Sequence, residues 1–269
     1  MHLRHVIINF SRELELKYKF DRNYTSDFCF HSRYICNYLT RKLRQSKYQT
    51  DGTYNMICIE LSDGTPRPPY IFVTETLIVQ VPFTPERYES IRGSDNCDYY
   101  LELIETGFRL VSTFKHIPLE VLMTPLLQFK EEGCQNRWIH KSKRYRPYNL
   151  GMALQCSFTT NDFSVTVVYT RLSDGHEYCR GQVIRTMPDE IFADGMYKDI
   201  KIVGDEVVIT NRYYPPIFRF KLTDILSGIY HCHISDAPYI DPEQRMVYYN
   251  IIEHLFYTGN ELTVCKTKE

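Results

Sequence analysis

The chain has 269 residues, 43% of them hydrophobic, which is enough to bury a substantial core in one large domain or in two of ordinary size. Its 32 basic and 33 acidic residues nearly cancel, so no overall field directs the chain to nucleic acid or to anionic lipid. No apolar run approaches the roughly 20 residues of a membrane span, and none at the N-terminus forms a signal-peptide core. We therefore expect a cytoplasmic protein that does not enter a membrane.

The first elements are predicted to be strands. Residues 3–20 divide into two of them, and the second is indicated by the alternation of charged and apolar residues over 13–20. In a strand this alternation places Leu14, Leu16 and Tyr18 on one face and leaves the other face in water.

A helix and two further strands follow. Apolar residues recur at helical intervals over 31–48, and several basic residues occupy the last turns, where cations suit the helix dipole. Strands are predicted over 54–61 and 70–81, and the density of β-branched residues in the second indicates a central strand.

The next part of the chain is predicted to be helical. Thr84 followed by Pro85 is typical of a helix start, and a longer helix is expected over 98–114. Pro118 is expected to begin a third helix, which Gly133 ends.

The second half of the chain is predicted to be almost wholly strand. The clearest hairpin turn is Val203-Gly204-Asp205-Glu206, where glycine stands first as a type II′ turn prefers. A last strand is predicted within 242–254. The remaining predicted strands, separated by turn residues, cover 151–159, 163–172, 177–186, 199–203, 206–211 and 216–222.

These elements predict an α+β fold. We expect a mixed or antiparallel sheet with three helices in the N-terminal half, 1–133, and a β-rich meander in the C-terminal half, 134–269. The sequence leaves open whether the halves are separate domains or one continuous domain.

The chain contains nine cysteines and 22 tyrosines. The odd cysteine count and the absence of any Cys-x-x-Cys pair disfavour a disulfide framework and a structural zinc site, so most cysteines should be buried free thiols. Tyrosine is common in strands and also at protein interfaces, and the doublet Tyr213-Tyr214 is a candidate contact for a partner.

The tetrapeptide Leu-Ser-Asp-Gly occurs twice, at 61–64 and 172–175. Asp can bond to its own downstream backbone and Gly accepts positive φ, so both copies are predicted to be strand-ending turns. Similarity outside the two turns is too limited to indicate a tandem repeat.

Two patterns would fit a metal-dependent enzyme. Asp189, Asp199 and Lys201 satisfy the letters of a PD-(D/E)-x-K nuclease motif, in which two acids bind Mg²⁺ and the lysine stabilises charge. On a strand, His231 and His233 would share a face and could ligate zinc or iron if a third ligand arrived from elsewhere. Both patterns are short and permissive, and we expect neither a cofactor nor a metal.

The densest basic cluster lies within residues 137–146 and includes the single tryptophan. Basic side chains mixed with aromatic ones can hold single-stranded nucleic acid or dock an acidic protein surface, and the same residues also serve to protect an exposed strand edge. The candidate partner-binding residues of this cluster are Trp138, Lys141, Lys143, Arg144, Tyr145 and Arg146.

In overall character the chain resembles the immunity proteins that bacteria keep against polymorphic or contact-dependent toxins. The resemblance lies in an α+β, tyrosine-rich chain without a nucleophile motif or phosphate-binding loop. It implies a cytoplasmic, non-enzymatic protein that neutralises a toxin domain by binding it, although this chain is nearly neutral whereas immunity proteins to nucleases are often acidic. The alternatives are a metal-dependent nuclease or hydrolase using Asp189, Asp199 and Lys201, and a nucleic-acid-binding accessory protein using residues 137–146.

Overall fold

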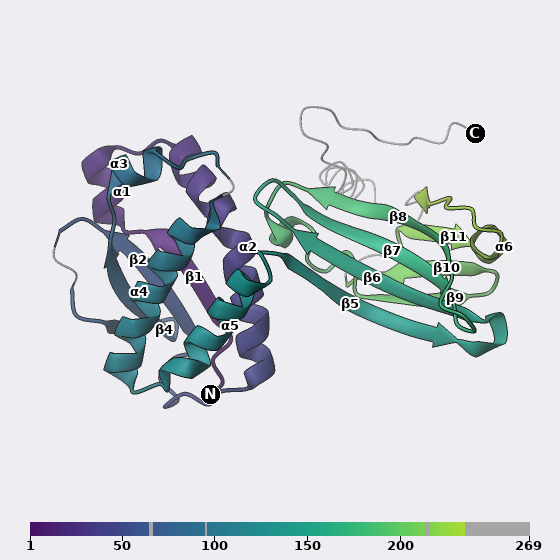
Figure 1. Ribbon diagram of the computed structural model, residues 1–269, viewed down its shortest axis with the longest axis horizontal. Coiled ribbons are helices and arrows are strands. Elements are labelled where there is room, and N and C mark those ends of the chain that lie inside the picture. The colour runs from purple at the N-terminus through teal and green to yellow at the C-terminus, as the bar shows by residue number, and fades with distance from the viewer. Residues whose placement is uncertain (65–66, 95, 213–215, 235–269) are drawn as a thin grey trace. The chain divides into compact units, whose positions relative to one another are not determined.

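The computed structural model describes residues 1–64, 67–94, 96–212 and 216–234. The chain forms two compact units, Met1–Asn136 (unit 1) and a second that begins at Arg137 (unit 2). Helices gather in the first half and strands in the second, which confirms the predicted α+β class (Figure 1).

Unit 1 contains one four-stranded sheet in the order β1-β2-β4-β3. The strands β1 (His5–Phe10), β2 (Met56–Ser62) and β4 (Thr76–Pro82) are parallel, and β3 (Tyr70–Phe72) pairs antiparallel with β4. Alternate residues form buried rows across the parallel strands, and the central row is Ile8, Ile59 and Val79. This face of the sheet is therefore the core of unit 1.

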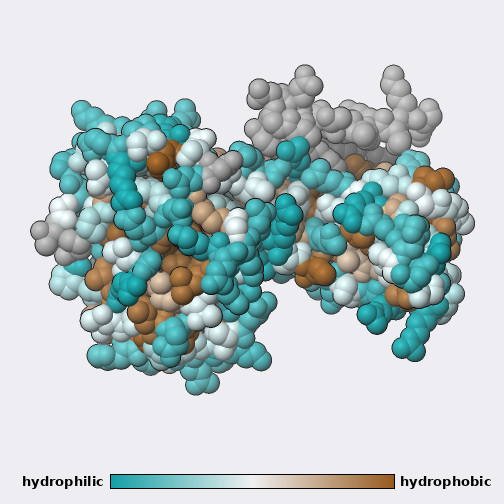
Figure 2. Space-filling model, in the orientation of Figure 1, coloured by the Kyte–Doolittle hydropathy of each residue, from teal (hydrophilic) through white to brown (hydrophobic). Residues whose placement is uncertain are grey.

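Helices cover that core. α2 (Arg22–Ser46) packs along β1 and α4 (Cys97–Lys115) packs on β4, while α5 (Leu119–Glu131) contacts both of these helices. The short α3 (Pro85–Glu89) begins after Thr84 as predicted. Figure 2 shows hydrophobic residues gathered on the visible face of unit 1 around α4 and α5.

Two strand predictions in unit 1 are wrong. Residues Arg12–Tyr18 form a helix, α1, because the hydroxyl of Ser11 accepts a hydrogen bond from the Leu14 N–H at 3.1 Å and caps its first turn. Leu14 is fully buried, whereas Leu16 is 66% exposed, so the alternating pattern does not mark a buried strand face.

The predicted central strand over 70–81 is divided by a turn. Glu75 has a φ of 57°, and its carbonyl and carboxylate accept hydrogen bonds at 2.9 and 2.7 Å from the backbone and side chain of Asn55. This tertiary contact fixes a turn that contains no glycine, proline or asparagine. Only β4 is central, and the residues of β3 are exposed at the sheet edge.

The described residues of unit 2 form two sheets, which Figure 1 shows one behind the other. The first has the order β5-β6-β7-β8, and the second has the order β12-β11-β10-β9. Aromatic side chains fill the space between them, as in the ring pairs Tyr169–Phe220 at 5.7 Å and Phe163–Tyr197 at 5.8 Å. The strands of the first sheet are β5 (Asn136–Tyr145), β6 (Leu150–Phe158), β7 (Phe163–Arg171) and β8 (Glu177–Thr186).

The second sheet includes the hairpin predicted at Val203–Glu206. Residue Val203 pairs with Glu206, and Gly204 at φ 62° is the turn residue with positive φ. The predicted strand within 242–254 lies outside the described residues. The elements of this part are β9 (Asp199–Val203), β10 (Glu206–Thr210), β11 (Phe218–Lys221), α6 (Leu222–Leu226) and β12 (His233–Ile234).

Candidate functional site: the outer face of the first sheet of unit 2

Residues 137–145 of the basic cluster lie on β5, which forms one edge of the first sheet, and Arg146 begins the 3₁₀ turn that follows this strand (Figure 1). Two candidates of the cluster are tied to the second sheet. The ammonium group of Lys143 lies 2.6 Å from the Asp199 carboxylate, and the Tyr145 hydroxyl accepts a hydrogen bond from the Ile202 N–H at 3.4 Å. Trp138 packs near the ring of Phe163 at 6.0 Å. These three side chains therefore connect β5 to its neighbours, and Trp138 and Lys143 also line hollows on this sheet.

The other cations of this cluster are exposed. Within the part of the chain that the structure describes, Arg137, Lys141, Arg144 and Arg146 form no ion pair. We call these four residues the basic strip. Lys141 is near enough to Asp199 to help lower the pKa of that carboxyl, whereas a cation with no carboxylate nearby keeps its full attraction for an anionic partner.

The far side of the same sheet differs. On β8, Arg180 pairs with Glu177, and Arg185 pairs with Asp162 at 2.7 Å. Each of these arginines therefore has a carboxylate beside it. The positive field of the sheet is concentrated at the β5 edge.

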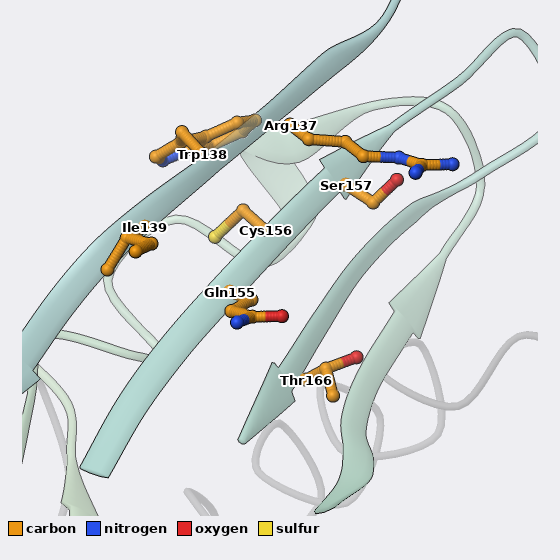
Figure 3. Close-up of a pocket in the computed structure, with 7 residues that line it drawn as sticks. All are labelled: Arg137, Trp138, Ile139, Gln155, Cys156, Ser157 and Thr166. Carbon is orange, nitrogen blue, oxygen red and sulfur yellow. The ribbon is translucent and has the colours of Figure 1, made fainter. Parts of the chain in front are cut away.

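Two shallow hollows lie on the outer face of this sheet. Hollow 1, of about 510 Å³, is formed by residues of three neighbouring strands, as Figure 3 shows. Its lining is Arg137, Trp138, Ile139, Gln155, Cys156, Ser157 and Thr166.

Hollow 2, of about 550 Å³, lies toward the other end of β5, and Gln155 lines both hollows. Its rim carries Ser142, Arg144 and Arg146 on one side and Thr170 on the other. No acidic residue belongs to the described lining of either hollow. The two hollows meet at Gln155, and we call them together the groove; its lining combines cations and hydroxyls with aliphatic side chains such as Ile139 and Leu172.

The floor of the groove follows from the alternation along β6. Leu154, Cys156 and Phe158 are buried between the sheets, so Gly151, Ala153, Gln155 and Ser157 belong to the outer face. These residues are small or polar and cannot fill the space above them. Sequence reasoning selected the basic strip but missed Gln155 and Thr170, although the alternation over 151–158 was a signal for an outward polar face.

The nuclease pattern does not form an open acid pair. Asp189 is buried and caps a short 3₁₀ turn, where its carboxylate accepts a hydrogen bond from the Ile191 N–H at 3.1 Å. Burial alone would raise the pKa of Asp199, but its bonds to Lys143 and the Ile200 N–H outweigh burial and hold the pKa below its ordinary value. Lys201 lies exposed two residues along β9. Asp199 is therefore engaged by a lysine of the basic cluster.

His231 and His233 do lie together, with ring centroids 4.2 Å apart. His231 Nδ1 is 3.8 Å from an Asp224 carboxylate oxygen. Over the described ranges, no group of three or more His, Cys, Asp or Glu side chains is placed to hold a metal ion.

Both Leu-Ser-Asp-Gly copies are turns, as predicted: Gly64 has a φ of 90° and Gly175 a φ of 73°. Asp63 pairs with Lys17, and Asp174 accepts a hydrogen bond from the His176 N–H at 2.9 Å. Asp63 therefore takes part in a surface ion pair, and Asp174 stabilises the backbone of its turn. Gly175 also lines hollow 2. Tyr213 and Tyr214 lie outside the described residues.

The cysteines differ from expectation in one respect. Cys97 and Cys134 form a disulfide between the start of α4 and the residues after α5, with a Cα–Cα distance of 6.6 Å. The other cysteines among the described residues are thiols outside this disulfide, and burial raises the pKa of Cys58 and Cys232 to about 12, which keeps them protonated. The odd number of cysteines disfavoured a disulfide framework, but one disulfide is present among the described residues.

No protein family, curated protein or solved structure matches this chain. Among the described residues, no helix is both long enough and apolar enough to cross a membrane.

Proposed function

We propose that this chain is a non-enzymatic binding module that binds an acidic protein through the basic strip of unit 2. The observation that carries the proposal is the contrast across one sheet. The arginines at the β8 side have carboxylate partners, whereas Arg137, Arg144 and Arg146 have no ion-pair partner within the described residues.

A protein partner is favoured over nucleic acid by the chemistry of the groove. Single-stranded nucleic acid is bound on aromatic side chains on which successive bases stack. Trp138 is the one aromatic residue in the described lining of the two hollows, and the other lining side chains are small, polar or aliphatic, such as Ile139 and Leu172. Exposed cations on such a surface complement the carboxylates of a protein and increase the rate of association.

The resemblance to immunity proteins makes a toxin domain with an acidic binding face the first partner of this class to test. In that case the protein acts by occupying the toxin, without chemistry of its own. A cytoplasmic location belongs to the same proposal, because the toxin would be met inside the cell.

The test is affinity capture from the native host, with the bound proteins identified by mass spectrometry and then purified for direct binding. We expect Arg144→Glu/Arg146→Glu to lose the partner. The matched control is Arg12→Glu/Arg22→Glu, which makes the same change of charge at exposed first-turn positions of α1 and α2, where an acid suits the helix dipole.

Two results would contradict the proposal. One is a partner that binds the Arg144→Glu/Arg146→Glu variant as well as it binds the control. The other is Mg²⁺-dependent cleavage of nucleic acid by the wild-type protein that is lost in Asp199→Ala, since this would establish the nuclease alternative.

A further inference from the structure

We propose that the groove formed by hollows 1 and 2 binds an acidic segment of the partner in extended conformation, lying along β5 and β6. This inference rests on the proposed function and deepens it, because it specifies which feature of the partner is recognised. It would not hold for a partner that binds the basic strip through a folded, convex surface.

The first support is the set of polar groups that the groove presents. Among the described residues, the hydroxyls of Ser142 and Thr170 and the amide of Gln155 have no protein hydrogen-bond partner, and Arg144 has no ion pair. These groups can donate to carboxylate oxygens, and an arginine can do so through two parallel bonds. A ligand rich in acceptors and negative charge satisfies them together.

The second support is how the groove is kept open. A Cβ atom at Gly151 would lie 2.5 Å from the Thr170 hydroxyl oxygen and 3.2 Å from the Leu172 side chain. Glycine on β6 therefore leaves the Thr170 hydroxyl free to face hollow 2. Ala153 beside it is the smallest side chain that a non-glycine residue can place on the floor.

The third support is spacing. Residues on one face of a strand repeat every second position, a rise of about 6.6 Å, and an extended peptide places alternate side chains at the same interval. Ser142 and Arg144 repeat at this spacing on β5, as do the outer residues of β6 from Gly151 to Ser157. From Arg137 in hollow 1 to Arg144 in hollow 2 the strand advances seven residues, or about 23 Å, which a segment of about eight residues spans.

The experiment uses the full chain and a fluorescently labelled peptide of about ten residues with alternating Glu and Ser. Anisotropy measures its affinity, and the emission of Trp138, the single tryptophan, reports whether hollow 1 is occupied. We expect binding at low salt that weakens as salt rises, together with a change in Trp138 emission. A Lys-Ser peptide and an oligothymidylate of equal length are the comparison ligands.

Two variants locate the site. Arg144→Gln is expected to weaken the Glu-Ser peptide about tenfold by removing a charge-assisted bond. Arg180→Gln is expected to change its affinity less than about twofold, because Glu177 already engages that arginine. Circular dichroism verifies that both variants are folded.

The inference is overturned if the Glu-Ser peptide does not bind, if the oligothymidylate binds more tightly than the peptide, or if Arg144→Gln leaves the affinity unchanged. The proposed function is tested separately by the partner. If Arg144→Glu/Arg146→Glu abolishes capture of the partner while no peptide binds, the basic strip is an interface but the groove is not a channel for an extended segment.

Discussion

Unit 1 and unit 2 each contain a glycine whose lack of a Cβ atom has a structural effect, and the two effects are opposite. In unit 1, a Cβ atom at Gly107 would lie 2.7 Å from the side chain of Ile59, so glycine lets α4 sit directly on the core row of the sheet. In unit 2, Gly151 makes room for the hydroxyl of Thr170 on the outer face of the sheet. Gly107 thus allows a helix and a sheet to pack closely in a core, whereas Gly151 leaves space on the surface of a sheet.

The two units also differ in what links their parts. In unit 1 the Cys97–Cys134 disulfide joins two helical segments. In unit 2 the described links across β5 and β9 are polar, chiefly the ion pair of Lys143 with Asp199. The described links thus include a covalent bond between helical segments in unit 1 and an ion pair between strands in unit 2.

The largest effect on stability is expected from Cys97→Ser/Cys134→Ser. The two cysteines are 37 residues apart, and releasing a loop of that size should lower the free energy of unfolding of unit 1 by about 4 kcal/mol. Urea unfolding measured by helical circular dichroism reports unit 1, which contains α1–α5, and Trp138 fluorescence reports unit 2.

A reductant should shift the urea midpoint of the helical transition in the wild-type protein to the midpoint of the variant. The same reductant should leave the midpoint of the variant unchanged. If the fluorescence transition moves as far as the helical one, the two units do not unfold separately. If neither moves, the disulfide contributes nothing. Disulfides are rare in a reducing cytosol, so the state of these thiols in native extract also tests the cytoplasmic prediction.

The next prediction compares alanine substitutions at Gly107 and Gly151. Gly107→Ala forces a methyl group into Ile59 and should cost unit 1 about 1–3 kcal/mol. Gly151→Ala should cost less than about 1 kcal/mol, because the nearest atom is a hydroxyl that can turn away, yet it should weaken the Glu-Ser peptide by narrowing hollow 2. Equal losses of stability at both positions would remove the contrast between core and groove.

The smallest effect is a pH dependence at Asp199. Because the pKa of Asp199 lies below its ordinary value in the folded protein, its contribution to stability is present above that ordinary value and is lost as pH falls through the folded pKa. Asp199→Asn should therefore be slightly less stable than wild type at neutral pH, by less than about 1 kcal/mol, and equal to it in strong acid. A difference that persists unchanged below about pH 2 would assign the loss to packing instead.

Local patterns sufficed for much of the fold. Proline marked the starts of α3 and α5, although neither helix has a side-chain cap, and turn residues separated β6 to β11, because these signals act within a few residues of the chain. They failed where a distant contact decided the outcome. Asn55 creates the turn at Glu75, and Leu14 alone of the α1 residues is buried, so the alternating pattern over 13–20 carried no strand information.

The candidate site was predicted only in part. The exposed residues of the basic cluster could be chosen from charge density, but the sequence could not show that Lys143 would turn inward to Asp199 while Arg144 stayed unpaired. That distinction depends on which side of β5 faces the second sheet. The ion pair of Lys143 with Asp199 also connects the basic cluster with the nuclease pattern, two features that the sequence presents as separate.

The most direct test of the account compares two pairs of arginines on one sheet. Arg144→Gln/Arg146→Gln and Arg180→Gln/Arg185→Gln each remove two positive charges from the first sheet of unit 2, and calorimetry measures the Kd of each variant for the purified partner. We predict that the first pair weakens binding at least about tenfold and that the second leaves it within about twofold, because Glu177 and Asp162 already engage those arginines. Equal losses, or a larger loss for the second pair, would contradict the assignment of the basic strip as the binding surface.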